Sequence, residues 1–445
     1  MNLAVRYFAQ VYDKDSGNVV EENLLYEKLI NFAKSIDDFG LRHLEQINLI
    51  GKSQDTFIKH QAKLFNDDDS CPNCGRKLTN RGVYYSDFHD VLTDHRVGIK
   101  RLTCTCGWHN KQSIKAIFGN AQHPELLKKQ LVTGSESSYE KASSSLNSES
   151  GTERSINNAS TIRKKLKKCG TILGEIKLTS TWTNSKKAVG ELVAEADGGH
   201  IQYIEKGKHS FEEMLTTIFR PEDLEAVNNN RNEFKNKICV GSALSDKQVT
   251  IKQLTINACK KMGMTKNTDI IALSDGAKNC WPVLEALVPF CKSVTTILDW
   301  FHVGKHFTSR ESKIPQELRV KYNKAKWHLW HGHPITAIIR LEQLKEEVED
   351  DSNAHEVIDW LINYINNNKS NIADYHKREL KDKIISSQTA ETTVNNVINS
   401  RQKNQQMRWS RDGAHSVIQI RTSIYSKSWK EDWNLLKNEI YTEAA

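Results

Sequence analysis

The chain has 445 residues, which is long enough for two or three domains with a sizeable buried core. Charged residues make up 27% of the sequence and hydrophobic residues 38%, a composition that excludes an intrinsically disordered chain. The formal net charge of +8 is a modest indication of a polyanionic partner. No apolar stretch reaches the length of a membrane span, and the first ten residues lack the apolar core of a signal peptide. We therefore expect a cytoplasmic protein without membrane attachment.

Changes in composition and periodicity divide the chain into six segments. They are a helical amino-terminal segment (1–66), a zinc ribbon-like module (67–130), a helix-turn-helix region with a linker (131–187), an α/β core (188–307), a helical insertion (308–385) and a carboxy-terminal segment (386–445). Helix is expected in the first segment because apolar positions such as Leu25 and Leu29 recur among polar residues. Strands alternate with helices in the fourth segment, which predicts an α/β fold.

Four of the nine cysteines form two tight pairs, Cys71-x-x-Cys74 and Cys104-x-Cys106, with 29 residues between the pairs. This spacing is typical of a zinc ribbon, in which four thiolates hold one structural zinc ion in tetrahedral geometry. His109 is an alternative ligand if Cys104 or Cys106 faces away. Chance clustering or a redox pair would also explain the pattern. However, the scattered remaining cysteines favour a metal site in a reducing compartment over a disulfide framework.

Segment 131–187 contains the signals of two successive helices. Ser137 followed by Glu140 predicts a capping box, and Gly151 interrupts the pattern before a second helix that is expected to begin near Ser160. Such a pair would be a helix-turn-helix with its basic second helix in the major groove of DNA. The residues expected to contact DNA are Arg163, Lys164, Lys165 and Lys168. A solvated basic linker explains the same run of charge equally well.

Aspartates follow three of the strands expected in the α/β core. These strands are expected at 191–196, 237–244, 249–254, 269–273 and 294–298, and the aspartates are Asp197, Asp275 and Asp299. Open α/β sheets place their sites at the carboxyl ends of strands. Two carboxylates on neighbouring strands can hold a pair of Mg²⁺ ions about 3.5–4 Å apart, the geometry of two-metal phosphoryl transfer. One such aspartate is explained equally well as a turn residue, but three in succession favour a site.

Longer motifs surround these aspartates and continue towards the carboxyl terminus. They are Glu-Ala-Asp197-Gly, Leu-Ser-Asp275-Gly-Ala, Ile-Leu-Asp299-Trp-Phe-His302, and a segment from Ala390-Glu391 through Arg401-x-Lys403 to Met407-Arg408-Trp409-Ser410 and Gly413-Ala414. Together they resemble the insertion-sequence DDE transposases of the ISKra and ISLre kind, a family that also carries a paired-cysteine module upstream. The order of three strands, a helix, a strand, a helix and a strand is similar to the ribonuclease-H-like layout, in which an antiparallel hairpin feeds a parallel pair.

The resemblance implies a ribonuclease-H-like catalytic domain with a helical insertion before a carboxy-terminal glutamate helix. It implies that Asp197, Asp275 and Glu391 form a catalytic triad that holds two Mg²⁺ ions. Glu391 comes from the resemblance alone, because a helical glutamate is a surface residue by default. The 115 residues between Asp275 and Glu391 leave room for the helical insertion. After Glu391, the resemblance places Arg401, Lys403 and Arg408 where they could contact phosphates.

Asp299 and His302 resemble an accessory motif beside the active site of several transposase families. His302 could contact a flipped base or a phosphate, and Asp299 is the alternative third metal ligand because it ends a neighbouring strand. His306 lies one helical turn beyond His302, which allows an i, i+4 metal pair. We prefer a structural or DNA-contacting role, because no further ligand is apparent nearby.

These features predict a DNA transposase that binds the ends of an insertion sequence and catalyses strand cleavage and strand transfer with two Mg²⁺ ions. Its partner would be double-stranded DNA, on which the chain would assemble as a homo-oligomer. Two alternatives stay open. One is a ribonuclease-H-like nuclease that cleaves without joining strands. The other is a catalytically idle, zinc-dependent DNA-binding protein, although the presence of all three acidic residues argues against it.

Overall fold

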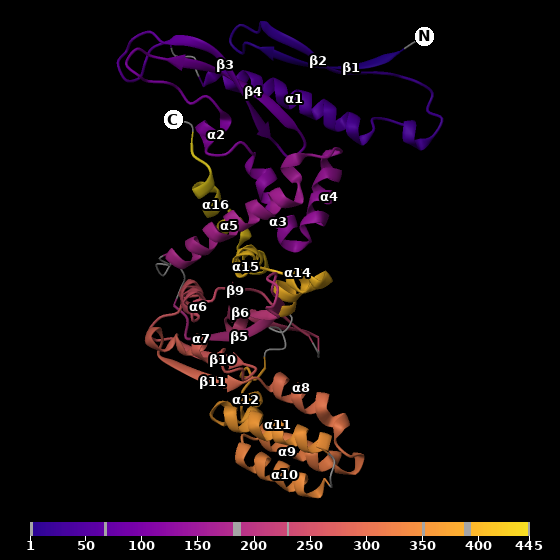
Figure 1. Cartoon of the computed structure of the whole chain (residues 1–445), viewed down its shortest axis with the longest axis vertical. Helices are drawn as coiled ribbons and strands as arrows, with labels where there is room; N and C mark the ends of the chain where they lie inside the picture. The colour runs from indigo at the N-terminus through magenta and orange to yellow at the C-terminus, as the bar shows by residue number, and fades with distance from the viewer. Residues whose placement is uncertain are drawn as a thin grey trace. The chain divides into compact units, whose positions relative to one another are not determined.

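The computed structural model describes residues 3–65, 69–180, 188–228, 231–348, 352–386 and 393–443. The chain forms two units, one of Met1–Leu166 with Trp433–Ala445 and the other of Lys167–Asp432. Each unit contains both helices and strands (Figure 1), so the prediction of an α/β protein is confirmed. Glu391, the third residue of the expected triad, lies outside the described residues. None of the helices within these ranges combines the length and the apolar character that crossing a membrane requires.

The amino-terminal unit contains two antiparallel hairpins and a set of helices. Its elements are β1 (Ala4–Tyr12), β2 (Val19–Leu29), α1 (His43–Leu64), β3 (Thr79–His89), β4 (Asp94–Thr103), α2 (Ile114–Phe118), α3 (Pro124–Glu136) and α4 (Tyr139–Ser150). The prediction of helix throughout 1–66 is therefore wrong for its first half. Aromatic and β-branched residues favour strands there. The chain reverses at a turn in which the Gly17 amide, at φ 72°, donates to the Asp13 carbonyl at 2.8 Å.

The two helices expected in 131–187 are present, with shifted boundaries. The cap of α4 is Ser138, whose Oγ accepts from the Lys141 amide at 3.2 Å, whereas the Ser137 hydroxyl donates to the Thr133 carbonyl. Gly151 ends α4 in the left-handed conformation that glycine tolerates best. The second helix, α5 (Ala159–Thr179), begins one residue before the predicted cap Ser160 and is longer than expected.

The second unit is built on a five-stranded mixed sheet with the spatial order β11-β10-β5-β6-β9. The strands are β5 (Glu191–Gln202), β6 (Ser210–Phe219), β9 (Ile238–Ser242), β10 (Asp269–Ser274) and β11 (Ser293–Leu298). β5, β6 and β9 are antiparallel neighbours, and β10 and β11 continue the sheet parallel to β5. An antiparallel hairpin therefore feeds a parallel pair, as expected. A short separate hairpin, β7 (Leu224–Asn228) with β8 (Arg231–Phe234), follows β6.

Two expectations for the sheet are wrong. Residues 249–254, expected to be a strand, form the start of the helix α6 (Val249–Lys261). The strand β6 was not predicted. The Asp246 carboxylate accepts from the Thr250 amide at 2.9 Å, which satisfies one of the free donors at the start of α6. Ile251, Leu254 and Ala258 then fall on one buried face at helical spacing.

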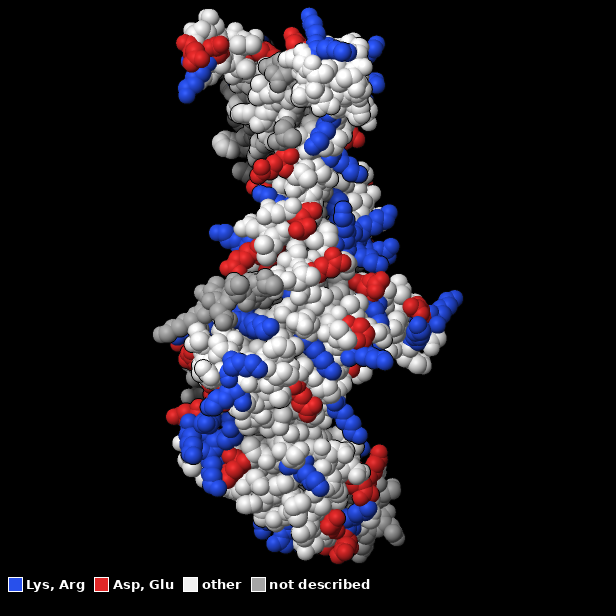
Figure 2. Space-filling view, turned by 90° about the vertical axis from the view of Figure 1, so that its left-hand side faces the viewer, with Lys and Arg blue, Asp and Glu red and all other residues white. Residues whose placement is uncertain are grey.

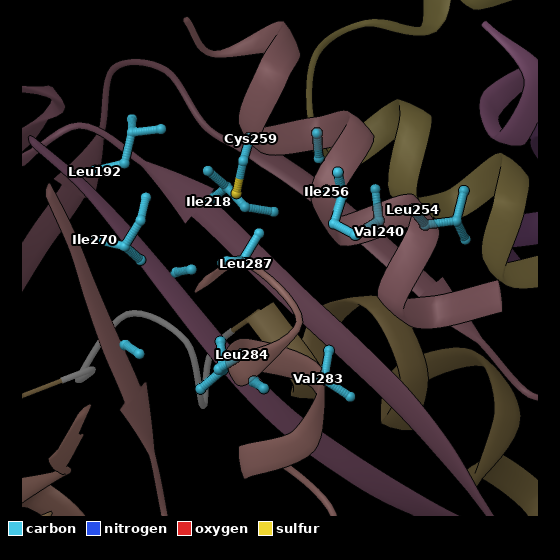
Figure 3. Packing of buried hydrophobic residues seen from close by; sticks show 14 of the residues in the cluster. Leu192, Ile218, Val240, Leu254, Ile256, Cys259, Ile270, Val283, Leu284 and Leu287 are labelled. Carbon is cyan, nitrogen blue, oxygen red and sulfur yellow. The ribbon is translucent and has the colours of Figure 1, made fainter. Parts of the chain in front are cut away.

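Alternation along β5 gives the sheet two distinct faces. Leu192, Ala194 and Ala196 point to one face, where they pack with residues of α6 and α7 (Trp281–Glu285), as Figure 3 shows for the labelled members of this cluster. Val193 points to the opposite face and shares a second cluster with Leu273, Ile297 and Tyr375, among others. Glu195 and Asp197 follow Val193 at two-residue spacing, so they lie on this second face.

A lobe of helices follows β11, as the sequence predicted. It consists of α8 (Trp300–Arg310), α9 (Arg319–Trp330), α10 (Pro334–Glu347), α11 (Ser352–Asn368) and α12 (Tyr375–Glu379) (Figure 1). Residues of α8 to α11 share one hydrophobic core. The chain then returns towards the sheet through a π-helical turn (Asn395–Asn399), α14 (Ser400–Gln402) and α15 (Arg411–Tyr425), and α16 (Trp429–Ile440) follows.

A close approach of α5 to α15 within the second unit requires a glycine. A Cβ added to Gly170 would lie 2.2 Å from the carbonyl oxygen of Ser416. Gly170→Ala is expected to lower the free energy of unfolding by about 1–3 kcal/mol because the helix backbones must move apart. Urea denaturation measures this change. The control is Gly304→Ala in α8, where an added Cβ meets nothing within 4 Å. Equal effects of the two substitutions would contradict this packing.

Candidate active site

The three predicted aspartates lie level with one another across three neighbouring strands. Ser274 of β10 pairs with Ala196 of β5 on one side and with Leu298 of β11 on the other. The residue that follows each of these three paired positions is therefore an aspartate. Asp197 follows Ala196, Asp275 follows Ser274 and Asp299 follows Leu298. Asp275 and Asp299 directly follow their strands. Asp197, predicted to end its strand, instead lies within β5, where it pairs with Leu215 of β6.

The charges of Asp275 and Asp299 act on Asp197, although among the described residues the three carboxylates do not converge as one group placed to hold a metal ion. Burial raises the pKa of Asp197 to about 6, and the charge of Asp275 is the next largest cause. Asp299 raises this pKa further, whereas the hydrogen bond from the Gly198 amide, at 2.7 Å, and the nearby His302 oppose the shift. Like-charged carboxylates in a partly buried site resist ionising together. A divalent cation between them would remove that repulsion.

Local hydrogen bonds fix Asp275 and Asp299. The Asp275 Oδ1 accepts from the Ala277 amide at 2.8 Å, and its carbonyl accepts from the Tyr364 hydroxyl at 2.9 Å. Asp299 is 1% exposed and caps α8, because its Oδ1 accepts from the Phe301 amide at 2.9 Å. Its other oxygen lies 3.8 Å from Nε2 of His302. Asp299 thus caps α8 and contacts His302. These two residues are the pair predicted to form an accessory motif.

His306 is packed among aromatic rings. Its ring centroid lies 4.8 Å from that of Trp360 and 4.7 Å from that of Tyr364. Burial, assisted by the charge of Arg310, lowers the pKa of His306 to about 4. Among the described residues, neither His302 nor His306 belongs to a group of three side chains placed to hold a metal ion. The preference for a structural role of His306 fits this packing.

Glu195 is a residue of this region that the sequence analysis missed. It lies two residues before Asp197 on the same face of β5 and is 4% exposed, and its Oε2 has no hydrogen-bond partner within the described structure. Burial, together with the charges of Asp299 and Asp197, raises its pKa well above the usual range. A buried carboxyl group that resists ionisation therefore lies next to the aspartates. An acidic residue inside the apolar run 192–196, at strand spacing from Asp197, was the available signal.

The segment after Glu391 returns to the same part of the sheet. The Lys237 ammonium donates to the Thr393 hydroxyl at 3.0 Å. Its positive charge also opposes the rise in the pKa of Glu195. Farther along, a Cβ added to Gly199 of β5 would lie 3.0 Å from Ile398 of the π-helical turn. Two residues beyond Asp197, the strand is thus in close contact with the segment that follows Glu391.

Of the basic residues expected to contact phosphates after Glu391, Arg401 does not fit. It is 2% exposed, and its guanidinium lies 4.9 Å from the centroid of the Trp409 ring. A planar guanidinium can be buried against an indole in this way, so Arg401 stabilises the fold. Lys403 and Arg408 are exposed.

Lys165 likewise points inward from α5. It is half-buried, and its ammonium donates to the Gln130 side-chain carbonyl at 3.0 Å and to that of Gln122. A helix with a buried stripe turns some of its basic residues towards neighbouring helices, so Lys165 binds within the protein, and its contact with DNA stays a prediction. Arg163, Lys164 and Lys168 are exposed as expected. Figure 2 shows Lys and Arg side chains gathered in several places on one face of the molecule.

Comparison with protein families adds a classification to this geometry. The model of an uncharacterised protein family, UPF0236, matches residues 121–433, which is most of the chain. The chain belongs to UPF0236. The UPF0236 match includes the three aspartates, the central sheet and the helical lobe. No curated protein matches the chain.

The four paired cysteines lie outside the UPF0236 match and form a second site. Four Sγ atoms all lie within 4.8 Å of one another, those of Cys71, Cys74, Cys104 and Cys106. His109 is not part of this group. The sulfurs of Cys71 and Cys106 are 3.6 Å apart and those of Cys74 and Cys104 are 3.5 Å apart. The Cys106 amide and neighbouring thiols lower the pKa of Cys104 to about 6, which favours a thiolate.

Two matching turns, one before β3 and one after β4, bring the cysteines together where the start of β3 pairs with the end of β4. In the first turn, the Gly75 amide donates to the Cys71 carbonyl at 2.8 Å, and in the second the Gly107 amide donates to the Cys104 carbonyl at 3.1 Å. Both glycines have positive φ angles, 69° and 92°. The two turns present four soft ligands to one point, an arrangement that can hold a metal ion.

Proposed function

We propose that the chain is a DNA transposase of the DDE type, which cleaves the ends of an insertion sequence and joins them to target DNA with two Mg²⁺ ions. The observation that carries this proposal is the alignment of Asp197, Asp275 and Asp299 across three neighbouring strands. Carboxylate oxygens are the ligands that Mg²⁺ prefers. Burial and, second to it, the charge of Asp275 raise the pKa of Asp197, and a bound cation would favour its ionised form.

The sheet supports the ribonuclease-H-like part of the proposal. Three antiparallel strands, β5, β6 and β9, continue into the parallel strands β10 and β11, with α6 before β10 and α7 before β11. This is the order of elements that the resemblance to DDE transposases implies. UPF0236 is often found in transposase-like proteins of insertion sequences, but membership in it is not specific to the DDE type.

In this proposal Asp197, Asp275 and Glu391 hold the two Mg²⁺ ions. When bound, the ions supply Lewis-acid activation of a water molecule, then of the freed 3′-hydroxyl, and stabilise the leaving oxygen. The contacts of Thr393 with Lys237 and of Ile398 with Gly199 support Glu391 as the third ligand, because they hold the following segment beside β5. Asp299 is the alternative. Its position as the cap of α8 suits a supporting role, in which it orients His302 towards a phosphate.

The cysteine cluster suits zinc and a structural role. Four thiolates around zinc at about 2.3 Å would place their sulfurs about 3.8 Å apart, close to the separations of 3.5 and 3.6 Å in this site. All four coordination positions would be filled by protein, which leaves none for a substrate. The ion would then fasten the ends of the β3–β4 hairpin.

We further propose that α4 and α5 read the ends of the element, with double-stranded DNA as the partner. The exposed residues Arg163, Lys164 and Lys168 would contact phosphates from one side of α5. The transposase would work as a homo-oligomer assembled on two such ends.

The first test replaces the carboxylates one at a time. Asp197→Asn, Asp275→Asn and Glu391→Gln should each abolish cleavage and joining while leaving DNA binding nearly intact, because a neutral amide holds Mg²⁺ poorly. Asp269→Asn is the control at the opposite end of β10, where Asp269 pairs with Ser293 and Lys292. The assay supplies DNA ends flanking the gene and a target plasmid. Wild-type cutting by Asp275→Asn would refute the proposed site, and cleavage without joining by the wild type would favour a nuclease.

The second test concerns zinc. Cys71→Ser with Cys74→Ser should remove about one zinc ion per chain and loosen the amino-terminal unit, while the second unit stays folded. Metal analysis and limited proteolysis measure the two effects. Cys169→Ser, a change at a buried cysteine outside the cluster, should leave the zinc content unchanged. A wild-type protein purified without chelator and found free of zinc would exclude the proposed site.

The third test measures the salt dependence of DNA binding. Neutralising Arg163, Lys164 and Lys168 together should weaken binding and flatten the plot of log affinity against log salt, by about one unit of slope for each lost phosphate contact. Lys165→Met is the matched control, since its ammonium binds Gln130 and Gln122 within the protein. If the triple variant keeps the wild-type slope, α5 does not face DNA.

A further inference from the structure

A second group of metal-ligating side chains lies in the helical lobe, apart from both sites above. His331 directly follows α9, and Asp374 and His376 lie at the start of α12. One ligand atom from each of the three lies within 4.8 Å of the other two. The ring centroids of His331 and His376 are 5.0 Å apart. Two imidazoles and a carboxylate thus converge from segments more than forty positions apart in the sequence.

The backbone itself brings these side chains together. His331 and Asp374 form an isolated antiparallel bridge, so their segments are joined by main-chain pairing. The turn at Gly332, with φ 72°, packs so tightly that an added Cβ would lie 3.1 Å from the Asp374 backbone. The convergence therefore depends on fixed backbone segments and not on long flexible side chains.

The present partners of Asp374 leave its carboxylate available to a cation. Its Oδ1 accepts from the Lys377 amide at 3.0 Å. Its Oδ2 contacts the Lys377 ammonium at 3.0 Å, but the side chain of Lys377 is largely exposed and can turn into solvent.

We propose that His331, Asp374 and His376 bind one divalent transition-metal ion, with zinc as the best match. Two imidazole nitrogens and one carboxylate oxygen are typical ligands of zinc, whereas Mg²⁺ prefers oxygen ligands alone. Three protein ligands leave a fourth position for water. This site is independent of the proposed transposase activity and of the cysteine cluster.

An ion at this position would act on the candidate active site through aromatic packing. Trp330 precedes His331, and Tyr375 lies between Asp374 and His376. The Trp330 and Tyr375 rings are stacked, and both contact Trp300, with centroids 4.8 and 4.9 Å from its ring. The Tyr375 hydroxyl donates to the Leu298 carbonyl at 2.7 Å, directly before Asp299. A metal ion would thus fasten the two segments that support the end of β11.

The test counts zinc ions on the full-length protein by equilibrium dialysis, with a weak chelator present to suppress binding to single histidines. The wild type should bind two zinc ions per chain, and His331→Ala with His376→Ala should bind one. The control is His333→Ala, an exposed histidine on the same turn, which should keep two. A double variant that binds as many zinc ions as the wild type overturns the proposal, whatever the occupancy of the cysteine cluster.

Cobalt substitution tells the two sites apart. Thiolate ligands give a strong sulfur-to-cobalt charge-transfer band, whereas nitrogen and oxygen ligands give only weaker visible bands. The double variant should keep the charge-transfer band and the visible bands of the thiolate site, and lose only the weaker visible bands of the nitrogen and oxygen site. Zinc should also raise the Tm of the wild type and change its tryptophan emission, and the double variant should show neither change from its second equivalent of zinc. Identical cobalt spectra for the two proteins would contradict the assignment, whatever the fate of the transposase proposal.

Discussion

Repulsion among carboxylates held at one level of a buried sheet is the constraint on which the rest of the second unit depends. Asp197, Asp275 and Asp299 follow paired positions on three adjacent strands, and Glu195 is buried on the same face. Burial raises the pKa of Asp197 to about 6, and the charges of Asp275 and Asp299 add to the shift. Such a cluster costs folding free energy unless a cation or a proton neutralises it, so its persistence in the fold favours a metal-binding function over a structural one.

The helical lobe stabilises this arrangement from outside the sheet. The Tyr364 hydroxyl binds the carbonyl of Asp275, and the Tyr375 hydroxyl binds the carbonyl that precedes Asp299. Thr296 of β11 donates to the side chain of Asn371 at 2.7 Å. These bonds use backbone and neighbouring groups and not the carboxylate oxygens of Asp275 and Asp299. The insertion between Asp275 and Glu391 therefore helps to position the carboxyl ends of β10 and β11.

Much of this could be predicted from sequence, where the signal was local and periodic. The cysteine pairs, the aspartates after apolar runs and the helical lobe were all predicted. The hairpin of β1 and β2 was missed because Leu25 and Leu29 fit helical spacing as well as strand alternation. β6 was missed and α6 was taken for a strand, since short apolar runs fit either element. The inward positions of Lys165 and Arg401 depend on tertiary partners, Gln130 and Trp409, that no local pattern reveals.

The central claim is that the aligned carboxylates bind divalent cations, and crystals soaked in Mn²⁺ test it most directly. Manganese takes the same oxygen ligands as Mg²⁺ and scatters X-rays anomalously. The account predicts an anomalous difference peak within coordination distance of both Asp197 and Asp275, and its absence in Asp275→Asn crystals grown and soaked in the same way. A wild-type map without a peak there, at a manganese concentration that fills exposed sites elsewhere, would contradict the account.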